Sequence, residues 1–557
     1  MNREKLRTFP RTLPRAIAVA ATMVAMAHGA HAADVTEEND NFKVFWTNTV
    51  KYSAGFRLQD PSATLLANPN ADDSNRNFSK GLMSNRIDLL SELDVVSRSG
   101  LGARLSAAGW YDSIYNNGNS NPGTSVNQTS VAANQFTNKT RELMGGQVEM
   151  RDAFIFGKTE VGGMPLTARL GQHALVWGES LFFAGNAIAG GQSAFDVSRL
   201  LADPTAQAKE FVLPVPQVSA QLQVSPDVTL GAYYQFGYKA NRMPAVGSYF
   251  STSDTAVNGA ENLLLPGLPA ARRDADMMPS DSGQYGVQAK WRLGETDLGF
   301  YAIRFHDKDF QQVVRLGSYP FLPPNVAVPT SYYLTYNEAT TAVGASASHS
   351  FGEMNVAIEA SVRDNQALAS SGHAADTSGL APPGVIAASN NTSNPAYAVG
   401  STGHINVNTI WALQPSALWR EATFVGELAW NRLLNCSKSC NALDPNVTRD
   451  AVAIRAVFEP AYRQVLPGLD LSVPLGVGYT PSGSRSVMGP AFPSEGGGDL
   501  TLGLNGVYEQ TWRFSLAYTH FFGPADTLLD TAQSPSFTYQ QSRADRDFLS
   551  FSIRRSF

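Results

Sequence analysis

Apolar residues alternate with polar or small residues along most of the chain. One such stripe runs from Val50 to Leu58, and another runs from Leu101 to Gly109. A period of two places successive side chains on opposite faces of a strand. Beyond residue 32 there is no apolar run of about 18 residues, the length that a membrane-spanning helix needs. The pattern therefore predicts an all-β protein.

The alternating segments pair into hairpins with short turns, and long polar segments separate the hairpins. Residues 218–224 and 230–238, for example, flank the turn Ser225-Pro226-Asp227. The long segments are rich in Asn, Ser, Gly, Pro and Asp, and they comprise residues 59–84, 112–147, 173–215, 239–283, 307–331, 364–403, 432–449, 481–498 and 523–546.

Nine long segments and eight short turns imply about 18 strands. Short turns at one end and long external loops at the other are typical of a transmembrane antiparallel outer-membrane β-barrel. In lipid, a closed barrel pairs every backbone polar group. We expect such a barrel, with 14 or 16 strands as alternatives. A soluble periplasmic β-sandwich or propeller is the competing interpretation, but the chain has no blade repeat and its loops are uneven.

The N-terminus carries the marks of a secretory signal peptide. Five basic residues precede an apolar run from Ala16 to Ala27, and the run is followed by Ala30-His31-Ala32. Such a run is too short to span a membrane, and an A-x-A site favours cleavage before Ala33. We predict a signal peptide at residues 1–32, a single barrel domain at residues 33–557, and the outer membrane of a Gram-negative bacterium as the location.

Composition and charge exclude several classes of protein. Charged residues make up 16% of the chain, against about 25% in soluble proteins. Without residues 1–32 the chain has 37 basic and 47 acidic residues, hence a net charge of −10. An acidic exported protein without a basic stripe is a poor candidate for binding nucleic acid.

Two cysteines, Cys436 and Cys440, lie in a polar stretch, and an exported protein meets an oxidising compartment. We therefore expect a local disulfide between them. Their spacing also suits two metal ligands, but zinc uses four ligands and no His is near. The sequence has no phosphate-binding loop or dinucleotide fingerprint, so it implies no metal site and no cofactor.

An enzymatic function is not expected. The mature chain has six histidines but neither a G-x-S-x-G elbow nor an H-E-x-x-H motif, and Gly178-Glu179-Ser180 fails the elbow spacing. His520 is interpreted as a wall residue. An outer-membrane hydrolase stays a third possibility, after a closed structural or adhesion barrel, which the Asn/Ser-rich loops at residues 116–128 and 389–395 would also suit.

Residues 173–215, which we term the hatch segment, mix aromatic and charged residues and do not alternate as a strand does. The sequence from Ser193 to Phe211 predicts helical structure, with a break at Asp203-Pro204. A segment this apolar should not lie wholly in water. It either folds into the lumen as a hatch or packs over the mouth or against a neighbouring protomer. The candidate residues are Trp177, Glu179, Ser180, Phe182, Phe183, Asp196, Arg199, Lys209 and Glu210.

Charged residues on the predicted strands are expected to face the lumen. They are interpreted as a solvated ladder of salt bridges rather than as a binding site. The set comprises Arg57, Arg86, Glu92, Asp94, Arg104, Glu149, Arg151, Arg169, Lys290, Arg292 and Glu359.

The C-terminal strand alternates and ends on an aromatic residue, which resembles the signal read by the barrel assembly machinery. Phe551, Ile553 and Phe557 are expected to carry this signal, whereas Arg555 occupies a position where an aromatic residue is usual.

The stretch from Leu170 to Ser180 resembles the R-x-G-x-x-x-x-x-W-G-E-S signature of a proteobacterial family of exported outer-membrane barrel proteins, domain-of-unknown-function family 1302. The similarity continues through Lys209-Glu210, Leu213 to Ser219 and Asp281 to Gly286. Relatives commonly have Asn-Pro before a hydrophobic residue and Asp, where this chain has Gln192 to Asp196.

The resemblance implies traffic of hydrophobic or lipid-like compounds, together with periplasmic lipid-transport or efflux-type proteins. We therefore expect an outer-membrane channel or transporter for small molecules. Outer-membrane lipid, lipopolysaccharide and the barrel assembly machinery are the other expected partners.

Overall fold

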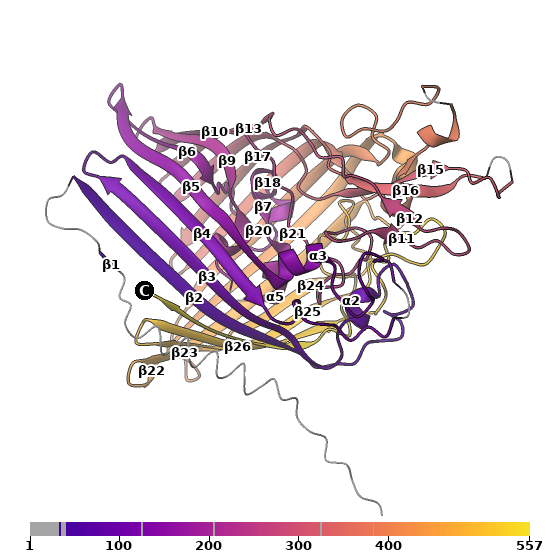
Figure 1. Ribbon diagram of the computed structural model, residues 1–557. Coiled ribbons are helices and arrows are strands. Elements are labelled where there is room, and N and C mark those ends of the chain that lie inside the picture. Colours follow the sequence, from indigo (N-terminus) through magenta and orange to yellow (C-terminus); the bar gives the residue numbers. More distant parts are fainter. Residues whose placement is uncertain (1–32, 35–40, 124–125, 204–205, 324–325, 383) are drawn as a thin grey trace, which may run out of the picture.

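The computed structural model describes residues 33–34, 41–123, 126–203, 206–323, 326–382 and 384–557. The predicted signal peptide at residues 1–32 lies outside the described residues. The main sheet closes on itself because β2 pairs with β3 on one side and with β27 on the other. Figure 1 shows the resulting barrel, with strands tilted across the view.

Eighteen strands of the described chain form the wall, and this confirms the predicted fold and strand number. The sheet comprises 20 labelled strands, but β1 (Ala33–Asp34) makes only a two-residue antiparallel pairing with β2, and β23 and β24 are two parts of one strand on either side of Val473-Pro474. The wall strands are β2 (Phe42–Arg57), β3 (Gly81–Ser97), β4 (Gly102–Asp112), β5 (Gly146–Val161), β6 (Met164–His173), β9 (Val215–Gln223), β10 (Val228–Gln235), β13 (Gln284–Leu293), β14 (Thr296–Phe305), β17 (Thr340–Phe351), β18 (Met354–Ala367), β20 (Val399–Leu413), β21 (Glu421–Lys438), β22 (Asp450–Leu466), β23 (Leu469–Ser472) with β24 (Leu475–Thr480), β25 (Gly497–Tyr508), β26 (Trp512–Phe522) and β27 (Phe548–Ser556).

The wall has its apolar side chains on the outside. Val287 and Val343 are 56% and 65% exposed, whereas the neighbouring Gln288 is buried. Trp46, Trp291 and Trp411 are also exposed. An outward apolar band with aromatic residues and a polar interior is the reverse of a soluble protein and is the pattern of a transmembrane β-barrel.

A second, five-stranded sheet lies among the long loops, where the sequence indicated only polar connections. It reflects pairings between different loops, which alternation within one segment does not reveal. Figure 1 shows it beyond the barrel wall. Its strands, in order, are β11 (Asn262–Leu263), β12 (Ala271–Arg273), β16 (Val328–Thr335), β15 (Gln311–Gly317) and β19 (Ala375–Asp376).

The helices are short. Among the residues described, none is long and apolar enough to cross a membrane. Instead of one helix over Ser193 to Phe211, this part of the hatch segment has two short helices, α5 and α6, next to a small ladder of β7 (Ala194–Phe195) with β8 (Val212–Leu213). The helices are α2 (Asp73–Arg76), α3 (Asn138–Thr140), η2 (Arg141–Gly145), η3 (Ala184–Asn186), α4 (Ala189–Gln192), α5 (Val197–Ala202), α6 (Ala208–Phe211), η4 (Ser371–His373), η5 (Ser378–Leu380) and η6 (Cys440–Ala442).

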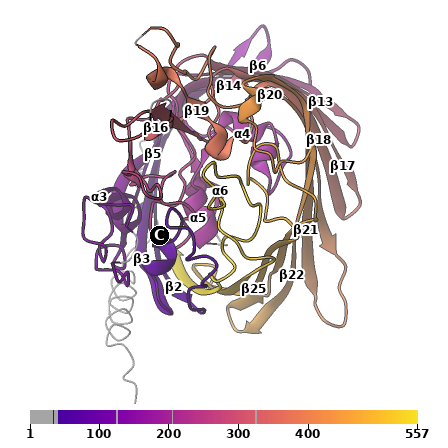
Figure 2. The same ribbon diagram turned by 90° about the vertical axis from the view of Figure 1, so that its right-hand side faces the viewer.

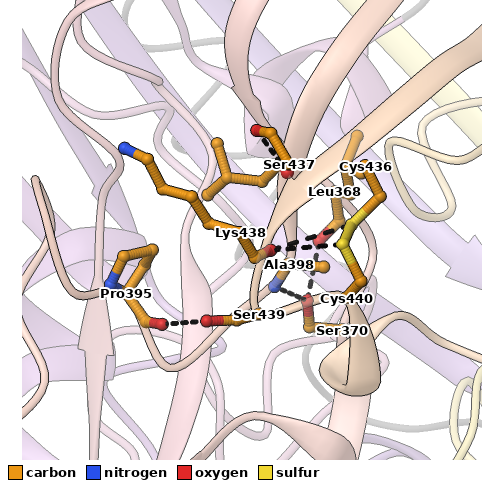
Figure 3. The surroundings of a disulfide bond; sticks show 10 residues. Leu368, Ser370, Pro395, Ala398, Cys436, Ser437, Lys438, Ser439 and Cys440 are labelled. Carbon is orange, nitrogen blue, oxygen red and sulfur yellow. Dashed lines mark hydrogen bonds between the residues drawn. A yellow bond between two sulfur atoms is a disulfide. The ribbon is translucent and has the colours of Figure 1, made fainter.

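A disulfide joins Cys436, near the end of β21, to Cys440, at the start of η6. Figure 3 shows its surroundings. The Ser439 hydroxyl donates to the Pro395 carbonyl at 2.5 Å, so the turn is tied to the neighbouring loop.

The C-terminal strand β27 closes the barrel, with Phe551 on its outer side. Arg555, which departs from the usual apolar pattern, places its guanidinium carbon 5.1 Å from the ring centroid of Trp512. A cation over an indole ring is attracted to it, which accommodates the charge at this position.

Candidate functional site

The hatch segment leaves the wall at His173 and returns to it at Val215, and these two residues are register partners. Between them the chain enters the barrel. Figure 2 shows α4, α5 and α6 inside the ring of strands. The segment therefore starts and ends at two neighbouring strands, and the chain between them lies in the lumen.

The tip of the segment, residues 177–192, reaches the far wall. Its partners include Glu359 on β18 and Glu427 on β21. β21 lies nearly opposite β6 in the ring, because β9, β10, β13, β14, β17, β18 and β20 come between them. The segment thus crosses the lumen.

Glu427 binds one turn of the tip. Its Oε2 accepts the backbone N–H groups of Leu181 at 3.0 Å, Phe183 at 3.2 Å and also Phe182, and its Oε1 accepts the Ser180 hydroxyl at 2.8 Å. The side chain of Glu427 lies on the lumen face of its strand and is buried. A buried carboxylate must be hydrogen-bonded, and here the tip supplies most of the donors.

Glu359 binds the tip at a second place. Its two oxygens accept the backbone N–H groups of Glu179 at 2.8 Å and Ile188 at 2.7 Å. Arg363, four residues further along β18 and on the same face, donates to the carbonyls of Gly185 at 3.0 Å and Ala187 at 2.7 Å. Both backbone donors and backbone acceptors of the tip are therefore bound by the wall.

The side chain of Asn186 sits in a polar site of the wall. Its Nδ2 donates to Asn406 Oδ1 at 3.0 Å, and its Oδ1 accepts from Asn431 Nδ2 at 3.2 Å. His404 Nδ1 lies 3.0 Å from the same oxygen. Three wall residues thus fix one amide of the tip.

Aromatic side chains of the tip pack against the wall. Trp177 is buried, with its ring centroid 5.0 Å from that of Tyr233 and 6.5 Å from that of Tyr301. Phe183 packs against Ala429 and Ala453 of the wall, and its ring centroid lies 5.5 Å from that of Phe492 in the loop between β24 and β25. The rings of Trp177 and Phe183 are therefore covered inside the barrel, whereas Val176, Leu181 and Leu200 of the hatch segment stay exposed.

The root of the segment, residues 193–211, is held by ion pairs. Arg199 lies 2.8 Å from Asp88 of β3 and 2.7 Å from Glu210. Burial opposes the charge of Arg199, but these two carboxylates outweigh burial and raise the pKa of its guanidinium. Lys209 lies 2.5 Å from Glu92. Four charged candidates of the sequence thus meet at this root.

Asp196 joins the root to a loop and starts α5. Its carboxylate accepts the Arg199 N–H at 2.9 Å as an N-cap and lies 2.9 Å from Arg242 Nη1. Lys51 of β2 forms an ion pair with Asp203.

A cavity of about 90 Å³ lies between α5 and the wall strands β2 to β4. The guanidinium carbons of Arg86 and Arg242 lie 4.9 Å and 5.8 Å from the Trp110 ring centroid. The apolar residues that line the cavity include Met83, Trp110, Tyr115, Leu143, Met144 and Phe250. The cavity therefore offers an apolar surface next to charged groups of both signs.

Within the described ranges, one cluster of three carboxylates could hold a metal ion. It consists of Asp72, Asp73 and Asp254, whose ligand atoms lie within 4.8 Å of one another. It lies in the loops and outside the lumen site. Burial, followed by repulsion from Asp72, raises the pKa of Asp73 to about 7. Burial and Asp73 raise the pKa of Asp254 well above its ordinary value.

His520 lies on β26, as the sequence predicted for a wall residue. Its Nδ1 lies 2.7 Å from Asp547 Oδ2, and the same carboxylate accepts the Tyr518 hydroxyl and the Phe521 N–H. This arrangement ties the last long loop to the wall.

Sequence reasoning did not single out Glu427, Arg363 or Asn186, and it treated Glu359 only as one lumen charge among many. The partners of these residues lie more than 170 positions away along the chain. The available signal in the sequence was a charged residue at an inward-facing position of a strand. Such a residue does not reveal which distant residue it contacts.

A closed barrel with an apolar outer face and a segment of aromatic and charged residues across its lumen defines the class: a transmembrane β-barrel with an occupied interior. The chain belongs to the family described as Protein of unknown function (DUF1302), whose family model matches residues 13–557. The resemblance carried by Trp177-Gly178-Glu179-Ser180 is thereby confirmed. No curated protein matches the sequence.

Several solved structures are similar to this chain at low identity. OccAB2 of Acinetobacter baumannii is 8% identical, with a TM-score of 0.43 and coverage of 92% of this chain and 98% of that chain. OccAB1 of the same organism is 9% identical, with a TM-score of 0.42 and coverage of 95% and 98%. OpdK of Pseudomonas aeruginosa, solved with vanillate, is 10% identical, with a TM-score of 0.40 and coverage of 92% and 98%. Likenesses this distant leave the function to be argued from the lumen of this chain.

Proposed function

We propose that this protein is an outer-membrane channel for small molecules, and that the hatch segment closes its lumen in the resting state. The observation that carries the proposal is the crossing of the lumen by residues 177–192, held by Glu359 and Glu427 of the far wall. A wide barrel with a plugged lumen provides a path that can be opened without breaking the wall.

The orientation follows from the loops. Short turns face the periplasm and long loops face the outside in barrels of this type. The hatch segment connects β6 to β9 at the long-loop end, so a solute from outside would meet the cavity beside α5 on its way in.

We further propose that the solutes have an apolar body, which agrees with the hydrophobic or lipid-like compounds that the family resemblance implies. The cavity supports this, because Met83, Leu143, Met144 and Phe250 lie on its surface. Burying such a surface against an apolar solute gains about 25 cal/mol per Å². Lipopolysaccharide, the barrel assembly machinery and periplasmic lipid-transport or efflux-type proteins are the proposed partners.

Uptake into proteoliposomes tests the proposal. The mature protein is compared with a hatch-replacement variant, in which a short Gly-Ser turn joins His173 directly to Val215. Because these residues already pair, the wall should remain intact. We expect faster uptake by the variant, and faster entry of an apolar solute than of a charged solute of equal size.

Two outcomes would contradict the proposal. A folded hatch-replacement barrel that admits neither solute would favour a closed structural or adhesion barrel. Faster entry of the charged solute would leave the channel in place but overturn the preference for apolar compounds.

A further inference from the structure

We propose that the turn Trp177-Gly178-Glu179-Ser180 and the wall carboxylates Glu359 and Glu427 form a latch that holds the hatch segment shut. The inference rests on the proposed function, because a latch has a role only if the segment moves. It gives a specific function to the Trp177-Gly178-Glu179-Ser180 motif, to which the sequence alone assigned none.

The first half of the latch is Glu427. Three consecutive backbone N–H groups, those of Leu181, Phe182 and Phe183, converge on one of its oxygens, and Ser180 donates to the other. Successive N–H groups that point at one anion form a concave anion site. Hydrogen bonds to a charged acceptor are roughly twice as strong as neutral ones, so Glu427 makes a strong contact with the tip.

The second half is Glu359, and it requires glycine at position 178. Gly178 has φ +94°, a region that side chains other than glycine rarely adopt. A Cβ at this residue would also lie 2.1 Å from Glu359 Oε2. The carboxylate approaches the backbone closely enough to accept the Glu179 N–H only because no side chain intervenes.

One polar atom of the interface lacks a partner. Trp177 Nε1 is buried and has no hydrogen-bond partner among the described residues. Buried polar groups without partners destabilise the arrangement that buries them, relative to one in which water reaches them. The two carboxylates thus hold the closed position together with Arg363 and the wall residues around Asn186, while the unpartnered Trp177 Nε1 favours release.

Ala187 offers a reporter of release. It is 1% exposed in the closed position and lies between the two latch contacts along the chain. The chain has two cysteines, and both are in the disulfide. In an Ala187→Cys variant the introduced thiol is thus the single free one, and it becomes accessible when the tip leaves the wall.

The test measures how fast a membrane-impermeant maleimide labels Ala187→Cys in the folded, heat-modifiable protein. Glu427→Gln and Glu359→Gln keep the size of the side chain but place an amide NH₂ against N–H donors. Asp94→Asn removes the same charge from the wall, where Asp94 pairs with Arg104 and not with the tip. We expect labelling to rise at least about tenfold for both Glu variants and to stay unchanged for Asp94→Asn.

Gly178→Ala tests the latch from the hatch side and leaves the wall untouched, so it keeps the proposal testable if a Glu variant fails to fold. It should also speed labelling. Unchanged labelling in folded Glu427→Gln, Glu359→Gln and Gly178→Ala would overturn the latch, as would equal acceleration by Asp94→Asn.

Solute uptake by the same variants separates the two proposals. Faster labelling without uptake by these variants or by the hatch replacement would support the latch and contradict the channel. Uptake through the hatch-replacement barrel with unchanged labelling of the latch variants would support the channel and contradict the latch.

Discussion

At the scale of single residues, the buried carboxylates of this protein divide into two kinds. Glu359 and Glu427 accept several N–H groups of the hatch segment. Asp73 and Asp254, in the loops, lie close to each other with fewer donors. Burial raises the pKa of both loop carboxyls and favours their protonated form.

The loop pair predicts a pH dependence. The pKa of Asp73 is raised from 3.8 to about 7 and that of Asp254 is also raised, so the folded loops bind protons that unfolded loops release. Their stability should be full below about pH 4 and fall as the pH rises towards about 7. The other charged groups acting on the pair are Asp72, Arg76 and Arg546.

Proteolysis of the external loops across this pH range measures the effect. Cleavage of the wild-type protein should increase with pH. Asp254→Asn should reduce the pH-dependent change in loop stability by at least about 1.4 kcal/mol, the free energy that corresponds to one pKa unit. Identical profiles for the two proteins would show that the carboxylate pair does not control the loops.

At the scale of elements, the hatch segment has little intrinsic stability. α5 has six residues and α6 has four, whereas isolated helices shorter than about 12 residues are marginal in water. The segment keeps its shape through its contacts at the tip and the root. The helix predicted over Ser193 to Phe211 is not continuous in the structure. α5 ends just before Asp203, where the sequence indicated a break.

Arg199→Ala tests the root. The substitution leaves Asp88 and Glu210 without their shared partner, and loss of one member of a buried ion pair costs about 3–5 kcal/mol. We expect faster proteolysis within residues 193–211. Arg104→Ala, which breaks a more exposed pair within the wall, is the matched control. Equal cleavage rates in the two variants would contradict a specific role of Arg199.

The disulfide is a local element. Cys436 and Cys440 are four positions apart, and closing so short a loop stabilises by only about 2 kcal/mol in the chain-entropy account. The double variant Cys436→Ser with Cys440→Ser should keep the heat-modifiable barrel, as gel mobility would show, and lose order only in the adjoining loops. Loss of the barrel itself would contradict this view.

At the scale of the whole molecule, the fold was readable because alternation and loop length are local properties. Counting nine long segments and eight turns yields the strand number, and the structure has the same number in its wall. Within the wall, the irregularity at Pro474 was missed, because a single proline between two alternating stretches leaves the pattern of apolar residues intact.

The lumen was readable only in part. The sequence drew attention to residues 173–215 because they are apolar and charged but not strand-like. It could not pair Glu427 with Ser180 or Asn431 with Asn186, because each pairing depends on how a closed ring brings distant strands to face one point. Contacts across a lumen follow from closure, and no local pattern records them.

Single-channel conductance in a planar bilayer tests the central claim, that the hatch segment closes a channel. The mature protein and the hatch-replacement variant joined from His173 to Val215 are compared under the same conditions. The account predicts a nearly silent wild-type barrel and large steady steps for the variant. Large steady steps of equal size from both proteins, or silence from both as folded barrels, would contradict it.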